Sequence, residues 1–298
     1  MRGASGLPVG DYLTRRANGD EMMAKLALRS PLPDSISTTD ITVTGRHGQR
    51  IPARVYRKAG SDSRALMVFV HGGGMIMGSI DTNNSTVSRY VDITGIPALS
   101  VGYRLAPEHP YPAQQDDVIE AIAYAYSHAG ELNIDRAHIG LVGESSGGGI
   151  CAGVALKLRD AGEHPIACLL LVYPMLDDRT NSAKAIASKF LTWTVADNIT
   201  GWNCLLEGKA GTPDVSPYAA PARATDLKDL PPTYIEVGDL DLFKDEDEKF
   251  AKDLKAAGVA VEFHLRHGAP HGFEVITPEL REGVFKQRAA FLSSYLSA

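Results

Sequence analysis

A serine set among glycines is the residue best placed to do chemistry in this chain. Ser145 lies in the run GESSGGG (143–149), after the apolar residues 139–142 and before a predicted helix over 150–161. A strand, a Gly-x-Ser-x-Gly turn and a helix in this order are typical of a nucleophilic serine, whose hydroxyl the tight turn exposes above a sheet. The motif alone also fits a glycine-rich turn without chemistry, because such short patterns arise by chance.

A second glycine-rich loop favours acyl transfer. The sequence HGGG (71–74) follows the apolar run 65–70, which is the strongest strand signal in the chain. Backbone N–H groups of such a loop can stabilise the negative oxygen of the transition state, and losing one donor costs about 3–4 kcal/mol. We expect the N–H groups of Gly73, Gly74 and Ser146 to form this oxyanion hole.

A serine hydroxyl needs a base that a carboxylate orients. In α/β hydrolases the chain order is serine, acid, histidine, so the acid should end a late strand. The predicted strand 233–237 is followed by Asp239 and Asp241, and the next strand is followed by His267 and His271. The pattern leaves both choices open.

The histidines near the C-terminus also raise the alternative of a metal site. His264, His267 and His271 have a spacing only loosely similar to that of metal ligands, and no glutamate completes a His-Glu-x-x-His helix. We therefore expect no metal and no cofactor.

Several motifs together resemble the hormone-sensitive-lipase group of α/β-hydrolase esterases. In chain order they are HGGG (71–74), YRLAPE (103–108), GESSGG (143–148), YP (173–174), DLFKDE (241–246) and HGF (271–273). The resemblance extends from about residue 40 to the C-terminus. It implies an α/β-hydrolase core, a helical cap and a Ser-Asp-His triad.

The same resemblance selects the acid and the base. Asp241 opens a motif similar to the family's Asp-Pro-Leu-x-Asp-Glu, although Leu242 replaces the usual proline, and His271 opens the family's His-Gly-Phe. The predicted catalytic residues are therefore Ser145, Asp241 and His271. Arg104 and Glu108 are expected to form a structural ion pair behind the site.

The order of predicted elements indicates an α/β-hydrolase fold with a mostly parallel, eight-stranded sheet flanked by helices. The first two strands alternate polar and apolar residues, as an antiparallel edge does, and the later ones are continuously apolar, as buried parallel strands are. The predicted strands span 41–44, 51–57, 65–70, 97–101, 138–142, 167–172, 233–237 and 259–265. The predicted helices between and after them span 84–92, 113–128, 150–161, 245–257 and 279–296.

Two segments have no predicted place in the sheet. Residues 1–38, helical over 12–28, and the insertion 178–225 are expected to form a cap on the catalytic domain 39–298, over the strand ends where open α/β sheets bind ligands. An apolar contact is expected to join the two segments. Side chains that could line an acyl pocket, or simply pack in core or cap, are Met22, Met23, Met75, Trp193 and Trp202.

Composition excludes several other classes of protein. The net charge of −6 and the absence of a basic cluster argue against nucleic-acid binding, and no stretch approaches the ~18 apolar residues of a membrane helix. Three widely spaced cysteines and an N-terminus without an apolar leader indicate a cytoplasmic protein.

These observations predict a serine carboxylesterase that acts on small to medium acyl esters. A lactonase, an amidase or a deacetylase with the same triad is the alternative within enzymes. A non-catalytic receptor on this fold is a more distant one, because such receptors typically lack the triad histidine. The expected partner is a small-molecule ester, and the N-terminal segment could instead form a homodimer contact.

Overall fold

The computed structural model describes residues 6–28, 31–184 and 187–297. The first five residues, which belong to the stretch expected to lack a leader, lie outside the described residues. No helix among the described residues is long and apolar enough to cross a membrane.

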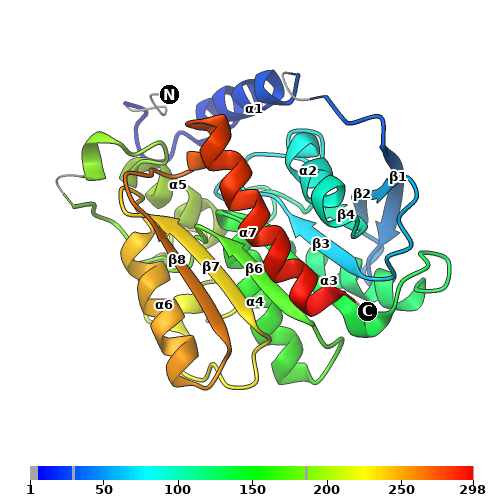
Figure 1. The fold of residues 1–298 in the computed structure, drawn as a ribbon. Coiled ribbons are helices and arrows are strands. Elements are labelled where there is room, and N and C mark those ends of the chain that lie inside the picture. Colours follow the sequence, from blue (N-terminus) through cyan, green and yellow to red (C-terminus); the bar gives the residue numbers. More distant parts are fainter. Residues whose placement is uncertain (1–5, 29–30, 185–186, 298) are drawn as a thin grey trace.

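One eight-stranded sheet forms the centre of the described chain, in the order β1-β2-β4-β3-β5-β6-β7-β8 (Figure 1). β1 and β2, and β2 and β4, pair antiparallel, and every other neighbouring pair is parallel. The strands are β1 (Ile36–Thr44), β2 (Arg50–Lys58), β3 (Leu66–Val70), β4 (Ala98–Val101), β5 (Ile139–Glu144), β6 (Cys168–Val172), β7 (Thr233–Gly238) and β8 (Val261–Arg266). The predicted α/β-hydrolase fold is confirmed.

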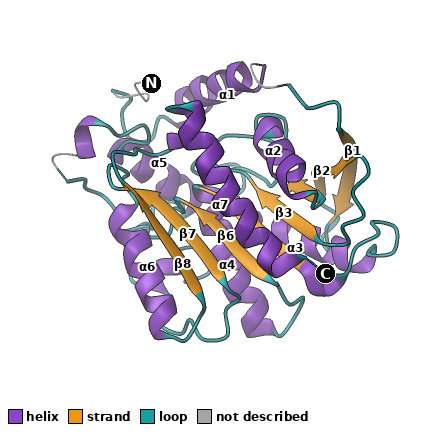
Figure 2. Cartoon of the chain, in the orientation of Figure 1, coloured by secondary structure: helices purple, strands orange, loops and turns teal. Residues whose placement is uncertain are grey.

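Helices cover both faces of this sheet (Figure 2). One apolar core lies between the sheet and α3, α4 and α6, and a second lies between the sheet and α2 and α7. Alternate residues of β3 point into the two cores, since Val68 belongs to the first and Phe69 to the second. The helices are α1 (Tyr12–Leu28), α2 (Asn84–Thr94), α3 (Ala113–Ser127), α4 (Ser146–Ala161), α5 (Val195–Leu205), α6 (Lys244–Ala256) and α7 (Pro278–Leu296).

Two predicted boundaries are wrong by more than two residues. α4 begins at Ser146 rather than at residue 150, because the glycines after the serine are helical. They are needed there: a Cβ on Gly147 would lie 2.0 Å from the Val70 carbonyl oxygen. β1 begins at Ile36, so residues 36–38 belong to the sheet and not to the N-terminal segment; the exposed polar residues that follow Ile36 hid the strand.

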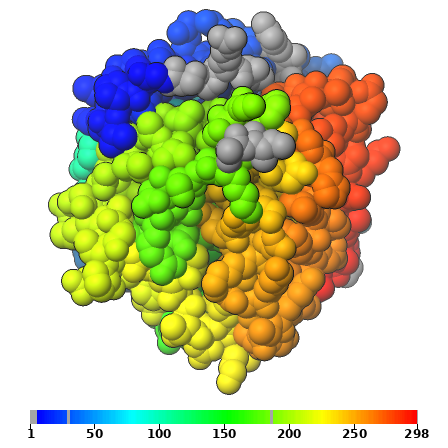
Figure 3. All heavy atoms as spheres, turned by 90° about the vertical axis from the view of Figure 1, so that its left-hand side faces the viewer, coloured from blue at the N-terminus to red at the C-terminus, as the bar shows by residue number. Residues whose placement is uncertain are grey.

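The N-terminal segment and the insertion lie together. α1 contacts α5, and Figure 3 shows the N-terminal residues (blue) above residues of the insertion (green to yellow-green) on one face of the molecule. The predicted contact between these segments was apolar. The observed contact is mainly polar. Arg15 is buried and its Nε donates to Asp197 Oδ1 at 2.6 Å, whereas Met22 is 45% exposed.

Candidate active site

Ser145 occupies a strained turn between β5 and α4. Its backbone has φ 56° and ψ −123°, and its N–H donates to the Val172 carbonyl at 2.8 Å. Left-handed backbone is costly for a residue with a Cβ and persists only where the surroundings enforce it. The glycines permit so tight a turn, because a Cβ on Gly143 would lie 2.4 Å from the Gly147 carbonyl oxygen. The turn presents the serine hydroxyl at the carboxyl end of β5.

The structure brings Ser145, His271 and Asp241 into one hydrogen-bonded chain. His271 Nε2 lies 2.9 Å from Ser145 Oγ, and His271 Nδ1 lies 2.8 Å from Asp241 Oδ2. Asp241 is buried, and its Oδ1 accepts the Phe243 N–H at 3.0 Å. This fixed carboxylate orients the imidazole so that its second nitrogen faces the serine.

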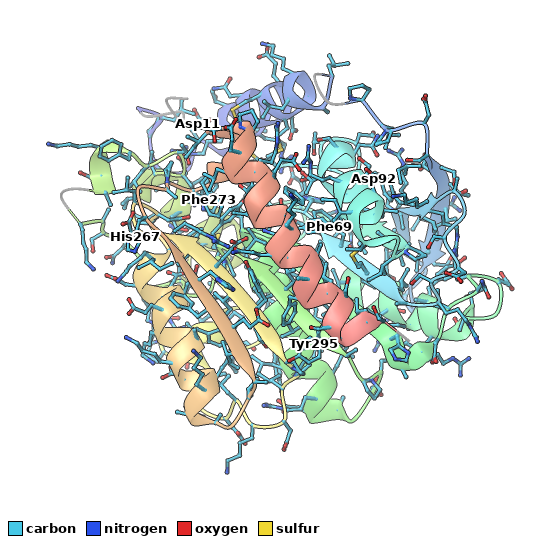
Figure 4. The ribbon with its side chains drawn as sticks, viewed as in Figure 1. Asp11, Phe69, Asp92, His267, Phe273 and Tyr295 are labelled. Carbon is cyan, nitrogen blue, oxygen red and sulfur yellow. The ribbon has the colours of Figure 1, made fainter. Side chains whose placement is uncertain are left out.

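The alternative acid and base pair with each other instead. His267 Nδ1 lies 3.1 Å from Asp239 Oδ2, and the His267 side chain is 83% exposed. In Figure 4, His267 lies at the end of β8. His264 faces Glu262 at 3.6 Å, so His264, His267 and His271 each have a different carboxylate partner and do not converge.

The glycine-rich loop after β3 lies against the serine turn. A Cβ on Gly72 would lie 3.1 Å from Ser145 Cβ, which shows how closely the two backbones approach. Gly73 and Gly74 have φ values of 119° and 60°. Within the described residues, the N–H groups of Gly73, Gly74 and Ser146 donate to no protein acceptor. Three unpaired donors in and beside the turn that carries a serine hydroxyl are the arrangement that an oxyanion hole requires.

His71 anchors this glycine loop from inside the protein. Its ring stacks on Tyr103 with centroids 4.2 Å apart, and the Tyr103 hydroxyl donates to the His71 carbonyl at 2.9 Å. Burial lowers the pKa of His71 to about 4, so its ring is neutral at pH 7. His71 is therefore a structural residue of the loop.

The predicted pocket residues are dispersed in the structure. Trp193 is half-buried and packs over the glycine loop, because a Cβ on Gly74 would lie 2.2 Å from its ring. Met75 and Trp202 are fully buried in the first core, and Met23 packs partly buried against that core. Trp193 thus packs on the glycine loop from the insertion, whereas Met75 follows Gly74 in the chain and its side chain lies in the core.

The predicted ion pair between Arg104 and Glu108 is wrong, because each has another partner. Arg104 binds the buried Asp117 with Nη2–Oδ1 at 2.8 Å. Glu108 binds Arg16 of α1 through two bonds of 2.8 Å, and this guanidinium lowers the pKa of Glu108 to about 2. Sequence spacing within one loop could not reveal a partner 92 residues away.

Two aromatic rings hold His271, a contact that the sequence did not predict. The Tyr173 ring centroid lies 4.4 Å from that of His271, and Phe243 meets the imidazole edge-on at 5.2 Å. Tyr173 has a positive φ of 37°, so its backbone is strained at the end of β6. The available signal was the Tyr-Pro motif at 173–174, which marked the position without giving its role.

A hollow elsewhere on the surface is not the candidate site. It encloses about 500 Å³ beside the insertion, and no residue of the hydrogen-bonded chain lines it. Its three basic side chains, Arg179, Arg223 and Lys249, each already pair with a carboxylate.

Comparison with known proteins identifies the family of the chain. Residues 67–275 match the model of a family described by its α/β-hydrolase fold. Esterase LipI of Mycobacterium tuberculosis is 33% identical over 250 residues, which cover 82% of this chain and 77% of LipI. The chain therefore belongs to the hormone-sensitive-lipase-like α/β-hydrolase family.

Solved structures extend the likeness over nearly the whole chain. A bacterial heroin esterase superposes with a TM-score of 0.90 at 32% identity, covering 98% of this chain and 95% of that one. An esterase from the bacterial hormone-sensitive lipase family superposes with a TM-score of 0.84 at 26% identity, covering 95% and 92%. Together with its relatives, the fold makes this protein a carboxylic ester hydrolase.

Proposed function

We propose that the protein hydrolyses small to medium acyl esters through a covalent acyl-enzyme, with Ser145 as nucleophile, His271 as base and Asp241 as the orienting acid. The observation that carries the proposal is the chain of hydrogen bonds of 2.9 and 2.8 Å that joins the three side chains. It is supported by the unpaired N–H groups of the facing glycine loop. The relatives called esterases support an ester, rather than an amide, as the bond that is cleaved.

In the first half of the reaction, Ser145 Oγ attacks the ester carbonyl carbon while its proton moves to His271 Nε2. The carbonyl oxygen becomes an oxyanion, which the N–H groups of Gly73, Gly74 and Ser146 stabilise. The bond from carbon to the alkoxy oxygen then breaks, and the alcohol leaves with the proton from His271. Asp241 stays ionised and stabilises the imidazolium.

In the second half, water attacks the acyl carbon and gives its proton to His271. The bond to Ser145 Oγ then breaks, the serine recovers its proton from His271, and the carboxylic acid leaves. No step requires a metal or a redox group.

We also propose that α1 and the insertion 178–225 form a cap that limits the length of the acyl chain. Trp193 packs on Gly74, so a side chain of the insertion lies against the proposed oxyanion loop. Arg16 of α1 donates to the Ile76 carbonyl at 2.5 Å, which ties the N-terminal helix to the same loop.

The decisive experiment combines one substitution with chemical labelling. Ser145→Ala should remove hydrolysis of p-nitrophenyl esters, with a loss of about 10⁶ in kcat, while circular dichroism stays unchanged. A phosphonate inhibitor should modify Ser145 alone in the wild-type chain, as mass spectrometry of the peptide would detect. Labelling at Ser146, or turnover by the alanine variant, would refute the assignment. Lactones and anilides tested beside the esters separate the alternative substrate classes.

A further inference from the structure

Arg288 of α7 is a buried cation behind the candidate site. Its side chain is 0% exposed and binds Glu236 of β7 and Glu274 of the short helix η4 (Phe273–Val275). Glu144 of β5 lies 3.9 Å away. Taking charges out of water costs several kcal/mol for each ion, so a cluster of this kind is weak evidence for stability. The buried cluster of charges therefore needs an explanation other than stability.

The three carboxylates precede or follow the proposed catalytic residues closely in the chain. Glu274 comes three residues after His271, Glu144 comes directly before Ser145, and Glu236 lies in the strand that leads to Asp241. Arg288 therefore joins the three segments that carry the triad. It lies beyond residues 67–275, the part of the chain that the family model matches.

Tyr173 carries the connection from this cluster to the base. Its hydroxyl donates to Glu274, with oxygen–oxygen distances of 3.1 and 3.2 Å, and its N–H donates to the Glu236 carbonyl at 2.7 Å. The Tyr173 ring packs on His271. Glu274 is thus connected to the His271 imidazole by two routes. One is the backbone of the loop that carries both residues, and the other is the Tyr173 side chain.

Apolar packing alone does not hold the loop after His271. Phe273 is buried beside α7 (Figure 4), but Val275 and Ile276 are about half exposed. The ion pair between Glu274 and Arg288 is the strong polar contact that ties this loop to α7.

We propose that Arg288 and Glu274 are positioning residues for the hydrolytic reaction, which latch the His271 loop onto the serine turn. The inference rests on the proposed function. Displacement of a reacting group by about 1 Å can cost on the order of 10² in rate. Loss of the latch should displace His271 from Ser145 and therefore lower kcat. The binding of a small ester should stay almost unchanged.

The first test compares two glutamates near the same helix. Glu274→Ala removes the latch, and Glu282→Ala removes an exposed ion pair between α7 and Arg89. With p-nitrophenyl acetate we expect kcat to fall about 30- to 100-fold in the first variant, with KM within about threefold. The second variant should stay within about twofold of wild type. Equal kcat in the two variants would overturn the proposal.

The second test compares two arginines that bind the same carboxylate. Arg288 and Arg266 both bind Glu236, but only Arg288 also binds Glu274. Arg288→Met and Arg266→Met should both lower Tm, and only the former should lower kcat as Glu274→Ala does. A kcat loss of equal size in both would mean that the cluster acts through stability. If Arg288→Met does not fold, the glutamate pair decides.

A structural readout separates this inference from the proposed function. A wild-type protein that hydrolyses no ester would defeat the proposed function. Crystal structures of Glu274→Ala and Glu282→Ala would still test the latch, whatever the substrate. The 2.9 Å contact between His271 Nε2 and Ser145 Oγ should lengthen only in the first. An unchanged contact in both would overturn the latch.

Discussion

The first and last helices of the chain both lie beside the candidate site, and they are attached in different ways. α7 buries an apolar face in the second core, formed by Val284, Phe285, Phe291, Leu292 and Leu296, and adds the buried Arg288. In α1 the buried side chain is Arg15, while Leu13 and Leu28 are exposed. One helix is part of the folded core, and the other is docked onto it.

Polar groups of α5 and of the segment after the glycine loop dock α1. Arg15 donates to the carbonyls of Leu7, Pro8 and Asp11 as well as to Asp197, and Asp20 accepts the Gly78 N–H at 2.9 Å. Hydrogen bonds in one network strengthen each other, so the loss of one member weakens the others. We therefore expect changes on the core side to alter the chemistry, and changes on the α1 side to alter which acyl chains are accepted.

After the loss of Ser145 itself, the largest effect should come from the acid on the core side. Asp241→Asn keeps the shape of the side chain but can no longer fix the imidazole tautomer, so kcat should fall by about 10⁴ with little loss of stability. Asp239→Asn is the matched control, because it changes an acid two residues away that pairs with the exposed His267. Steady-state kinetics and thermal unfolding of both variants test this. A greater loss in the Asp239 variant would make that residue the acid.

A smaller loss of kcat is expected from a change in the glycine loop, which lies between the core side and the α1 side. A Cβ on Gly74 would lie 2.2 Å from the Trp193 ring, and the φ of 60° disfavours any side chain. Gly74→Val should therefore displace the proposed oxyanion donors and lower kcat by about 10²–10³, more than it raises KM. A raised KM with unchanged kcat would mean that the loop only shapes the pocket.

The comparison also explains how far the sequence could predict this molecule. Local patterns suffice for the apolar strands and for α1, because those signals lie within a few residues of each other. Short motifs also mark Ser145 and His271 as candidates, and the structure places their side chains 2.9 Å apart. Local patterns do not suffice for partners distant in sequence. The binding of Arg16 to Glu108, and of Arg288 to Glu274 and Glu236, depends on how the sheet brings helix ends together. Exposed polar residues likewise hid the first half of β1.

Undocking α1 should alter selectivity rather than chemistry. Arg15→Met leaves the buried Asp197 without its cationic partner, so α1 should loosen and the protein should lose stability. We expect kcat/KM for an acetyl ester to stay within about threefold, and the preference between octanoyl and acetyl esters to shift about tenfold, or about 1.4 kcal/mol. Lys25→Met breaks an exposed pair on the same helix and is the control. An unaltered acyl-length profile in a folded Arg15 variant would mean that α1 is not part of a cap.

The smallest effect concerns the charge of Glu144, beside Ser145 on the core side. Burial, and then the neighbouring Glu274, raise the pKa of Glu144 to about 8. An unfolded glutamate has a pKa of about 4.3, so the folded state holds a proton that the unfolded state has lost. The stability linked to this group is complete below about pH 4.3 and is lost as the pH rises towards 8.

Glu144→Gln cannot ionise, so its Tm should fall less than that of the wild type between about pH 5 and pH 8. Some slope should remain, because burial raises the pKa of Glu246 to about 8 as well. Glu282→Gln is the control. Arg89 lowers the pKa of Glu282, so the stability linked to Glu282 is present above about pH 4.3 and is lost only on acidification. The slope of Tm between about pH 5 and pH 8 should therefore be that of the wild type. Differential scanning calorimetry across this range gives the slopes. If Glu144→Gln and the wild type have the same slope, Glu144 is ionised in the folded protein, and Arg288 compensates three negative charges rather than two.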